Sequence, residues 1–314
     1  MSKARELRKR LDALNRGPLP GREPPDVDRE RLRKKLRGKN KEEPPAEQQD
    51  PVRYRRDLPR SESRPPRRRT PREEVALEEA LDGYEIDAPN AGRAYLVETA
   101  IQDLAETWDP LCGLFRERFL DAASNVRRRI AVRCEEEEIA PEDVLFVDLE
   151  TTGLSSTPLF LIGVMHCADG GLVVRQFLAR DYSEEAATIS LFTDMLQRKR
   201  LLVTFNGKSF DLPYVRVRAA ANRIPFSAEQ AHLDLLHECR RVWGQKLPNC
   251  KLQTLETHIC GRRRDDDIPG AEIPAAYHEY VRTQNAADIV RIVKHNLLDL
   301  ATLAELMVRM PPPR

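Results

Sequence analysis

The sequence predicts a mixed α/β domain, in which helices flank a central sheet, preceded by a disordered basic tail. Three observations predict it. The stretch Val144–Leu154, VLFVDLETTGL, reads as a short buried strand that ends in acidic residues and a glycine. Two further apolar runs stand on either side of an Asp-Gly-Gly turn at residues 169–171, which is a hairpin signal. A helical repeat of apolar residues follows over Glu184–Lys199, and helices that follow strands in this way favour an α/β fold.

The first part of the chain is rich in Pro, Arg and Glu and holds few large apolar side chains, so we predict that residues 1–75 are disordered. Residues 1–70 contain 23 Lys and Arg against 12 Asp and Glu, whereas the remaining residues contain 29 against 39. This tail fits two interpretations, a solvated charged segment or a basic arm that binds nucleic-acid phosphates by releasing their counterions. The run RPPRRR, Arg64–Arg69, favours the second.

Residues 76–140 are predicted as a transition, either a small cap or an N-terminal extension of the domain that follows. A short helix is expected within Glu74–Leu81. Apolar spacing over Tyr95–Trp108 and Leu111–Ser124 indicates packed structure. The residues of this segment reveal no role for it.

The pattern becomes regular over residues 141–312, which we predict to be the main folded domain. The predicted strands are Val144–Val147, Leu159–His166, Leu172–Leu178 and Leu201–Phe205. The predicted helices are Glu184–Lys199, Asp211–Asn222, Leu233–Trp243, Leu252–Ile259 and Ala286–Met310. A polar loop over Arg262–Pro274 stands between the last two helices.

Composition limits the classes of protein that fit. The six cysteines form no C-x-x-C pair and lie far apart in the sequence, so we expect reduced thiols and a cytoplasmic location. No apolar run approaches the ~18–20 residues that a membrane span needs, so we expect no membrane partner. The basic N-terminus has no apolar region behind it and is not expected to be a secretory signal.

Paired acids at the end of the first predicted strand point to a cation site. Asp148 and Glu150 are two residues apart, and side chains alternate along a strand, so both face the same side. Asp211 follows the strand LLVTF near a predicted helix start, where an acid also serves as a cap or dipole partner. Asp299 borders the apolar face of the last helix, one turn after His295, although such a pair is also common on helix surfaces.

Considered together, these four carboxylates favour a metal site. Four acids brought together repel one another unless cations lie among them. Two Mg²⁺ or Mn²⁺ ions ~3.5–4 Å apart would satisfy them and serve an in-line displacement at phosphorus. His295 would then accept the proton of the attacking water, since an imidazole has an unperturbed pKa near 6.5.

Three stretches in this order carry a family resemblance: VLFVDLETTGL, LLVTFNGKSFDLPYV and VKHNLLDLATL. They resemble the three motifs of the DEDD 3′–5′ exonucleases, within the ribonuclease-H-like superfamily. The stretches FNGKSFDLP, HLDLLHECRRVWGQKLPNCKLQTLE and DDDIPGAEIP look like the YprB-like branch of that superfamily. The resemblance covers roughly residues 141–310, about half of the chain, and it implies a ribonuclease-H-like fold.

The resemblance also implies roles for single residues. Asp148 and Glu150 match the metal ligands of the first motif, Asp211 the acid of the second, and Asp299 the last metal ligand. One subgroup of the family has a His five residues before the final Asp, and another has a Tyr four residues before it. His295 stands four before, and a shift of one residue turns a helical side chain by ~100°, so its place at the site is expected while its role as base stays open.

Candidate substrate contacts lie beside these acids. We expect Thr151, Asn206 and Lys208 to contact a phosphate or the terminal nucleotide; the alternative for the Asn-Gly pair is simple turn chemistry. Asp234 is expected to have a structural hydrogen-bonding role on a helix.

Two polar groups leave alternatives open. The residues His237, Cys239, Cys250, His258 and Cys260 superficially suggest zinc, but their spacing matches no compact zinc pattern, so buried thiols are the expectation. The basic run 262–264 next to the acidic run 265–267 fits either a nucleic-acid contact or a self-paired surface loop.

The sequence therefore predicts a 3′–5′ exonuclease that hydrolyses phosphodiester bonds of DNA or RNA with two Mg²⁺ or Mn²⁺ ions. Its expected partner is nucleic acid, with a single-stranded 3′ end, and no organic cofactor is expected. One alternative is a catalytically silent nucleic-acid-binding module of the same fold. Another is a structural protein whose tail recruits a partner.

Overall fold

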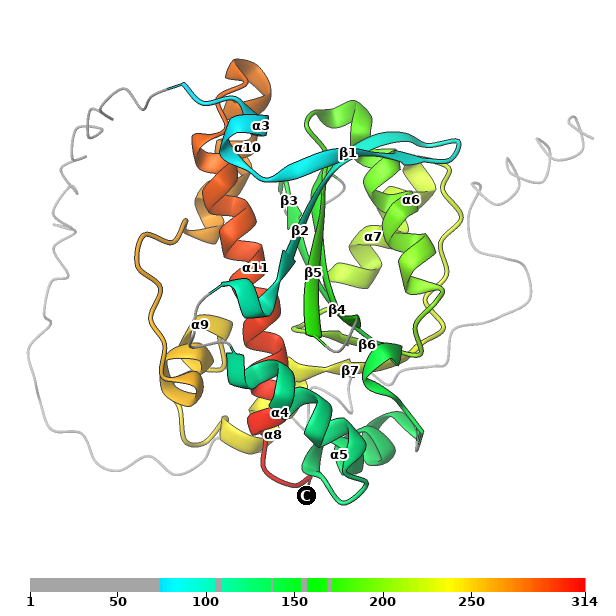
Figure 1. The fold of residues 1–314 in the computed structure, drawn as a ribbon, viewed down its shortest axis with the longest axis vertical. Helices are drawn as coiled ribbons and strands as arrows, with labels where there is room; N and C mark the ends of the chain where they lie inside the picture. Colours follow the sequence, from blue (N-terminus) through cyan, green and yellow to red (C-terminus); the bar gives the residue numbers. More distant parts are fainter. Residues whose placement is uncertain (1–73, 105–108, 137, 154–156, 169–170, 314) are drawn as a thin grey trace, which may run out of the picture. The chain divides into compact units, whose positions relative to one another are not determined.

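The computed structural model describes residues 74–104, 109–136, 138–153, 157–168 and 171–313. The predicted tail over residues 1–75 therefore lies outside the described residues, except for its last two positions. The described residues form a central sheet with helices on both faces (Figure 1).

The sheet has seven strands, in the spatial order β1-β2-β5-β4-β3-β6-β7. Neighbouring strands are antiparallel from β1 to β3, whereas β6 pairs parallel with β3 and with β7. The strands are β1 Gly83–Ala88, β2 Gly92–Ala100, β3 Val144–Thr151, β4 Leu159–Ala168, β5 Gly171–Leu178, β6 Leu201–Thr204 and β7 Ala231–Asp234.

The α-helices differ widely in length, from single turns to the 23 residues of α11. They are α3 Leu77–Ala80, α4 Asp109–Leu120, α5 Asn125–Cys134, α6 Glu185–Leu196, α7 Asp211–Ala221, α8 Leu235–Trp243, α9 Leu252–Leu255, α10 Ile273–Thr283 and α11 Ala287–Arg309. A π-helical turn, Glu256–Cys260, continues α9. Short 3-10 turns lie at Ile101–Asp103, Pro141–Asp143, Tyr182–Glu184 and Gly270–Glu272.

The sheet separates two layers of the core, and the inner strand β3 contributes side chains to both. Val144 and Phe146 pack in the core on the side of α4 and α11, whereas Leu145 and Val147 pack on the side of α6 and α7. Both layers are visible in Figure 1, with α11 on one side of the sheet and α6 and α7 on the other. A strand that is buried on both faces reads as a continuous apolar run, which is why VLFV was recognisable in the sequence.

The segment over residues 76–140 adds two strands to the sheet. β2 pairs with β5, and β1 pairs with β2 at the edge. β1 was not predicted from the sequence, because only Ala88 of its six residues is buried and two of its three exposed residues, Glu85 and Asp87, carry charge. The helix α4 then packs Phe115 and Phe119 against the α11 side of the sheet.

Two other predictions about secondary structure were wrong. Leu233 and Asp234 lie in β7, and the helix that was expected to include them begins only at Leu235. The helix α10 was missed because its first two residues were counted in the predicted loop Arg262–Pro274, which contains two prolines. One of them, Pro274, stands in the first turn of α10. Proline fits that position because the first turn does not use its N–H groups.

All six cysteines lie among the described residues, and each is a free thiol. Within the part of the chain that the structure describes, no helix is both long enough and apolar enough to cross a membrane.

Candidate functional site

The predicted acids of β3 face the helix α11. Asp148 and Glu150 continue the side of the strand on which Val144 and Phe146 pack, because side chains alternate along it. The pairing with β4 shifts register between Glu150 and Thr151, so the strand becomes irregular just after the two acids. Both carboxylates are partly buried at the end of the strand.

The other two predicted acids come from helices. Asp211 is the first residue of α7 and is buried, with 6% of its surface exposed. Asp299 lies on α11, on the helix that packs against β3, and its side chain is mostly buried. The four acids therefore come from three elements that are far apart in the sequence.

These four carboxylates form one electrostatic group. Burial raises the pKa of Asp148 well above its ordinary range, and the charges of Asp299, Glu150 and Asp211 raise it further. Burial likewise raises the pKa of Glu150, followed by the charges of Asp299 and Asp211. Burial raises the pKa of Asp211 to about 7, with a smaller contribution from Asp234. Neighbouring carboxylates thus disfavour the charged forms of Asp148 and Glu150, whereas burial is the main cause for Asp211.

A buried amide that the sequence analysis missed holds Asp148 in place. Asn296 Nδ2 donates to Asp148 Oδ2 at 2.8 Å, and Asn296 Oδ1 accepts from Gln176 Nε2 at 2.8 Å. Asn296 has no exposed surface. In the sequence Asn296 is visible only as the residue after His295 in the last motif. Nothing in the sequence links it to Gln176.

A glycine makes room for this amide. Gly163 on β4 is paired with Asp148 on one side and with Gln176 on the other. A Cβ atom at position 163 would lie 1.9 Å from Asn296 Oδ1. The amide of Asn296 therefore lies over Gly163 and joins Asp148 on β3 to Gln176 on β5, where a side chain on β4 would not fit.

His295 is buried and held by a second acid. Its Nδ1 lies 2.8 Å from Asp267 Oδ1, and its Nε2 lies 3.6 Å from Asp299 Oδ2. The predicted offset therefore brings the imidazole to Asp299, inside the protein and not on the surface. A hydrogen bond from Nδ1–H to Asp267 would leave Nε2 able to accept a proton.

One arginine lies among the acids. Arg264 Nη2 is 2.5 Å from Asp299 Oδ1, and Arg264 Nε is 2.7 Å from Glu256 Oε2. Its Nη1 is 3.4 Å from Asp267 Oδ2, and only 6% of the side chain is exposed. Arg264 was expected in a self-paired surface loop or a nucleic-acid contact, but it is buried against Asp299, a predicted metal ligand.

The loop after β6 is tied to Asp234. The carboxylate of Asp234 accepts from the backbone N–H groups of Asn206 at 2.8 Å and Lys208 at 3.1 Å. It also accepts from the N–H of Leu236 at 3.1 Å and so caps α8. The hydrogen-bonding role of Asp234 is structural, and it fixes Asn206, whose φ of 69° lies in the left-handed region.

The three candidate substrate contacts lie in different surroundings. Asn206 lines an open pocket of about 470 Å³ together with Asp148 and Asp299. Thr151 Oγ1 donates to the carbonyl of Gly153 at 2.8 Å, within its own loop. Lys208 is exposed. Burial raises the pKa of Cys134 to about 11, which the charge of Lys208 opposes, and burial lowers the pKa of His232 to about 4, to which Lys208 adds.

Three of the five residues that superficially suggest zinc are free thiols, of which Cys239 is buried and Cys250 and Cys260 are half-buried. Burial raises the pKa of Cys260 to about 12 and that of Cys239 still further, which keeps both thiols protonated. Among all the residues that the structure describes, no three His, Cys, Asp or Glu side chains are gathered tightly enough to hold an ion as they stand.

The donor set of the candidate site nevertheless suits a hard cation. Asp148, Glu150, Asp211 and Asp299 offer only oxygen ligands, which Mg²⁺ and Mn²⁺ prefer. Burial raises the pKa of Asp148, Glu150 and Asp211, and neighbouring carboxylates raise the first two further, so a bound cation would favour the charged forms. Arg264 provides a cation beside Asp299, so an ion that binds there meets a competing guanidinium.

Comparison with known families agrees with this geometry. Residues 145–311, just over half of the chain, match the model of a family described as the RNase_H superfamily. The chain belongs to the RNase H superfamily. The ribonuclease-H-like fold that the three motifs predicted is thereby confirmed.

Two individual proteins show the extent of the similarity. A segment of 173 residues is 33% identical to the uncharacterized protein YprB of Bacillus subtilis (strain 168), and covers 54% of this chain and 42% of that protein. The chain thus spans less than half of the length of this relative. The family B DNA polymerase from the hyperthermophilic archaeon Pyrobaculum calidifontis matches with a TM-score of 0.42 and 19% identity, over 55% of this chain and 25% of that one.

Proposed function

We propose that this RNase H superfamily member is a 3′–5′ exonuclease that hydrolyses phosphodiester bonds of DNA or RNA with two Mg²⁺ or Mn²⁺ ions. One observation carries the proposal. Three further carboxylates, drawn from β3, α7 and α11, lie close enough to Asp148 for each to raise its pKa. A buried group of four acids beside an open pocket is the donor set that phosphodiester hydrolysis by two metal ions requires.

In this proposal Asp148, Glu150, Asp211 and Asp299 hold the ions. When bound, the ions would lower the pKa of the attacking water and stabilise the leaving oxygen. Asn296 donates to Asp148 Oδ2 and fixes the direction in which the other oxygen of Asp148 points. The proposed catalytic domain is residues 141–312, extended at its edge by β1 and β2.

His295 is the proposed proton acceptor. Its Nδ1 lies 2.8 Å from Asp267 Oδ1, which leaves Nε2 directed towards Asp299, 3.6 Å away. His295 is buried on α11, so its imidazole ring is held in one orientation. In the proposal this orientation lets it act as the base although it stands four residues before Asp299.

The substrate would enter the pocket lined by Asp148 and Asp299. That pocket also contains Phe205, on which a base can stack, and two cations, Arg240 and Lys251, for backbone phosphates. Thr151, Asn206 and Lys208 remain proposed contacts of the terminal nucleotide. The free thiols fit the proposed cytoplasmic location.

The test uses purified full-length protein with 5′-labelled and 3′-labelled single-stranded DNA and RNA, in the presence of Mn²⁺ or Mg²⁺. We expect a ladder of shortened 5′-labelled products, which a chelator and the variant Asp148→Asn abolish. Asp87→Asn, at an exposed site on β1, is the matched control and retains activity. Equal degradation by wild type and Asp148→Asn would disprove the proposal.

A second candidate function is a catalytically silent nucleic-acid-binding module. The ion pair between Arg264 and Asp299 favours it, because a guanidinium stands where a metal would bind. Measuring oligonucleotide binding beside cleavage, on the same protein with Mn²⁺, separates the two functions. A silent module binds the oligonucleotides and yields no shortened products, whether or not Mn²⁺ raises its melting temperature.

A further inference from the structure

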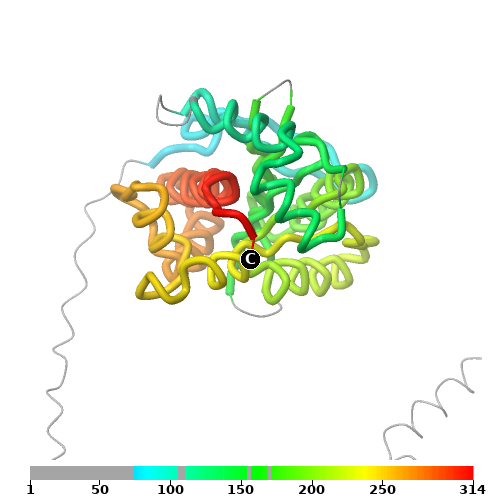
Figure 2. Tube along the Cα trace, turned by 90° about the horizontal axis from the view of Figure 1, so that it is seen from below, coloured from blue at the N-terminus to red at the C-terminus, as the bar shows by residue number. Residues whose placement is uncertain are grey.

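The helix α8 lies between two pockets. Leu236 and Arg240 line the pocket of the candidate site, whereas Glu238, Arg241 and Val242 line a second pocket of about 490 Å³. The second pocket is completed by α5 and by the chain after α11, which Figure 2 shows at the end of the molecule where the C-terminus lies. Its volume falls in the ~300–1,000 Å³ range that is usual for ligand pockets.

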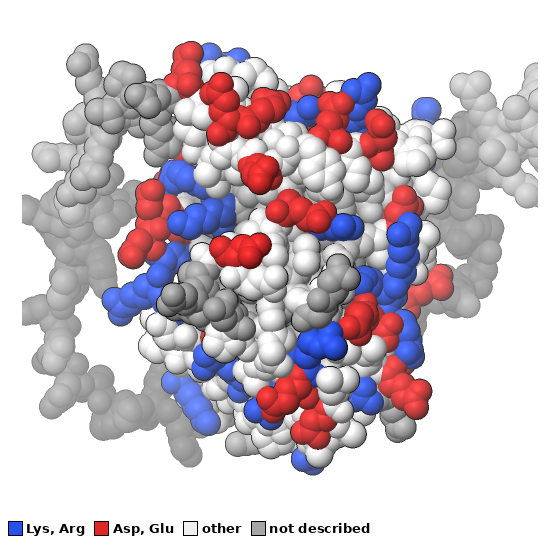
Figure 3. All heavy atoms as spheres, in the orientation of Figure 1, with Lys and Arg blue, Asp and Glu red and all other residues white. Residues whose placement is uncertain are grey.

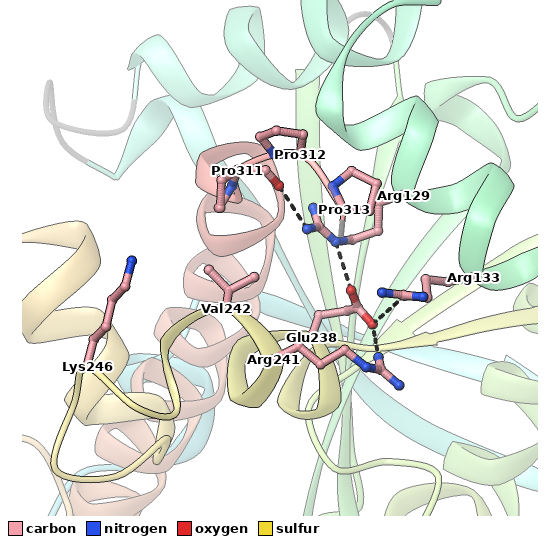
Figure 4. A pocket seen from close by; sticks show the side chains of 9 residues that line it. All are labelled: Arg129, Arg133, Glu238, Arg241, Val242, Lys246, Pro311, Pro312 and Pro313. Carbon is pink, nitrogen blue, oxygen red and sulfur yellow. Dashed lines mark hydrogen bonds and ion pairs between the residues drawn. The ribbon is translucent and has the colours of Figure 1, made fainter.

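Basic side chains dominate this second pocket (Figure 4). Arg129 Nε and Arg133 Nε contact the Glu238 carboxylate at 3.0 and 3.1 Å, and Arg241 pairs with the same carboxylate. Three guanidinium groups thus share one carboxylate, and Lys246 adds a further positive charge at the rim. The lining residues therefore carry a net positive charge of about three, which an anion would balance.

One of these arginines is deeply buried. Arg129 is 1% exposed, and its Nη2 donates to the carbonyl of Pro311 at 2.8 Å. Its Nη1 has no hydrogen-bond partner among the described residues. Burying a guanidinium is unfavourable unless its charge and its donors are satisfied, so a cluster of this kind is better explained by a ligand than by stability alone.

Basic residues also connect the two pockets. Arg240 and Lys251 line the candidate site, and Lys246 lies between them in the sequence and lines the second pocket. Lys208 belongs to the loop that places Asn206 at the candidate site, and it lies near Cys134, next to Arg133. By contrast, acidic and basic side chains are interspersed over the described residues on the face shown in Figure 3.

We propose that the second pocket binds a backbone phosphate of the same nucleic-acid strand whose 3′ end occupies the candidate site. Arginine forks suit phosphate oxygens, and the pocket has three of them on one side. Val242 and the prolines 311–313 form an apolar wall on which a ribose or base can rest. This inference rests on the proposed function, which places the 3′ end in the candidate site. It adds a second contact to the same strand, several nucleotides before that end.

The test measures binding to the full-length protein in the presence of chelator, so that cleavage plays no part. The double variant Arg241→Gln/Lys246→Gln changes two exposed side chains and leaves Arg129 and Arg133 on Glu238. We expect its affinity for a fluorescent 12-nucleotide strand to fall roughly tenfold, and its salt dependence to decrease by a slope of about one. A 3-nucleotide strand is expected to bind wild type and variant equally.

The matched control is Arg282→Gln, an exposed arginine of α10 that lines neither pocket. It keeps wild-type affinity, and melting temperatures confirm that all variants fold. Unchanged 12-nucleotide affinity in the double variant overturns the inference. An equal loss of affinity for the 3-nucleotide strand or for inorganic phosphate also overturns it, because the pocket would then be a site for a free phosphate. So does a loss of affinity for a phosphopeptide without a loss for the 12-nucleotide strand.

Failure of the proposed function gives a different result. If Asp148→Asn leaves cleavage unchanged while the double variant binds the long strand weakly, the exonuclease proposal fails and the phosphate contact stands. If cleavage depends on Asp148 and the double variant binds normally, only the present inference fails.

Discussion

The candidate site and the second pocket are electrostatic opposites on either side of α8. In the candidate site four carboxylates gather, with the guanidinium of Arg264 paired to one of them. In the second pocket three guanidinium groups gather around the carboxylate of Glu238. Each cluster keeps one counter-charge and an excess of the other sign, so the first suits cations and the second suits anions. A phosphodiester strand with bound metal ions provides both.

The counter-charge of the basic cluster is expected to matter most for stability. Glu238→Ala leaves Arg129 buried without a carboxylate, and we expect the free energy of unfolding to fall by about 3–5 kcal/mol. Urea unfolding measures this loss. Glu279→Ala, which breaks an exposed ion pair with Arg282, is the control and costs less than about 1 kcal/mol. A loss no larger than that of the control would show that Glu238 is not needed to hold the arginines.

Neutralising an acid of the candidate site is expected to stabilise the fold, whereas neutralising Glu238 destabilises it. The pKa of Asp211 is about 7 in the fold against an ordinary value of 3.8, so the folded state retains a proton that the unfolded chain has lost. Stability from this group is therefore present at low pH and is lost as pH rises from about 4 to about 7. Asp211→Asn has no such dependence, and we expect it to be more stable than wild type at pH 8 by up to about 4 kcal/mol in chelator.

The same comparison at about pH 3 is the control, because Asp211 is then largely protonated in both the folded and the unfolded state and the two proteins differ little. With Mn²⁺ at pH 8 the order reverses, since only wild type keeps the ligand. Urea unfolding at the two pH values measures both effects. A wild type that is more stable than Asp211→Asn at pH 8 in chelator contradicts the expectation.

The amide that supports Asp148 links the acidic cluster to the sheet. Asn296→Ala removes the donor to Asp148 and leaves one polar group of Gln176 unsatisfied, so we expect a loss of about 1–3 kcal/mol and a large loss of cleavage. Gly163→Ala should act in the same way, because its Cβ would displace Asn296. Asn125→Ala removes one long bond, of 3.4 Å, and is the control. Normal cleavage by Asn296→Ala would exclude the supporting role.

The smallest expected effect concerns the guanidinium in the acidic cluster. Arg264→Gln removes the group that competes with an ion for Asp299, so Mn²⁺ is expected to bind roughly tenfold more tightly, about 1.4 kcal/mol. Titration calorimetry measures the affinity. Arg291→Gln, whose side chain pairs with Asp288 and Asp266, is the control and leaves the affinity unchanged. Weaker Mn²⁺ binding in Arg264→Gln would mean that Arg264 supports the ion and does not compete with it.

Residue pattern predicted the parts of the fold whose periodicity is strong. The apolar run of β3, the hairpin of β4 and β5 and the amphipathic α6 were all recognisable. The edge strand β1 was not, because half of its residues are exposed and its burial does not alternate. The boundary between β7 and α8 was also missed, since Asp234 ends one element and caps the next.

By itself, the sequence determined which acids to consider and that two of them lie on the same side of β3. That was possible because strand alternation is a local property, and because the three motifs follow one another in a family order. Only the tertiary structure decided which residues surround them. Asn296 meets Asp148 across 148 positions, and Arg129 meets Glu238 across 109. Such contacts depend on how the elements pack, and no local periodicity specifies them, so Arg264, Asn296 and the basic pocket became visible only in three dimensions.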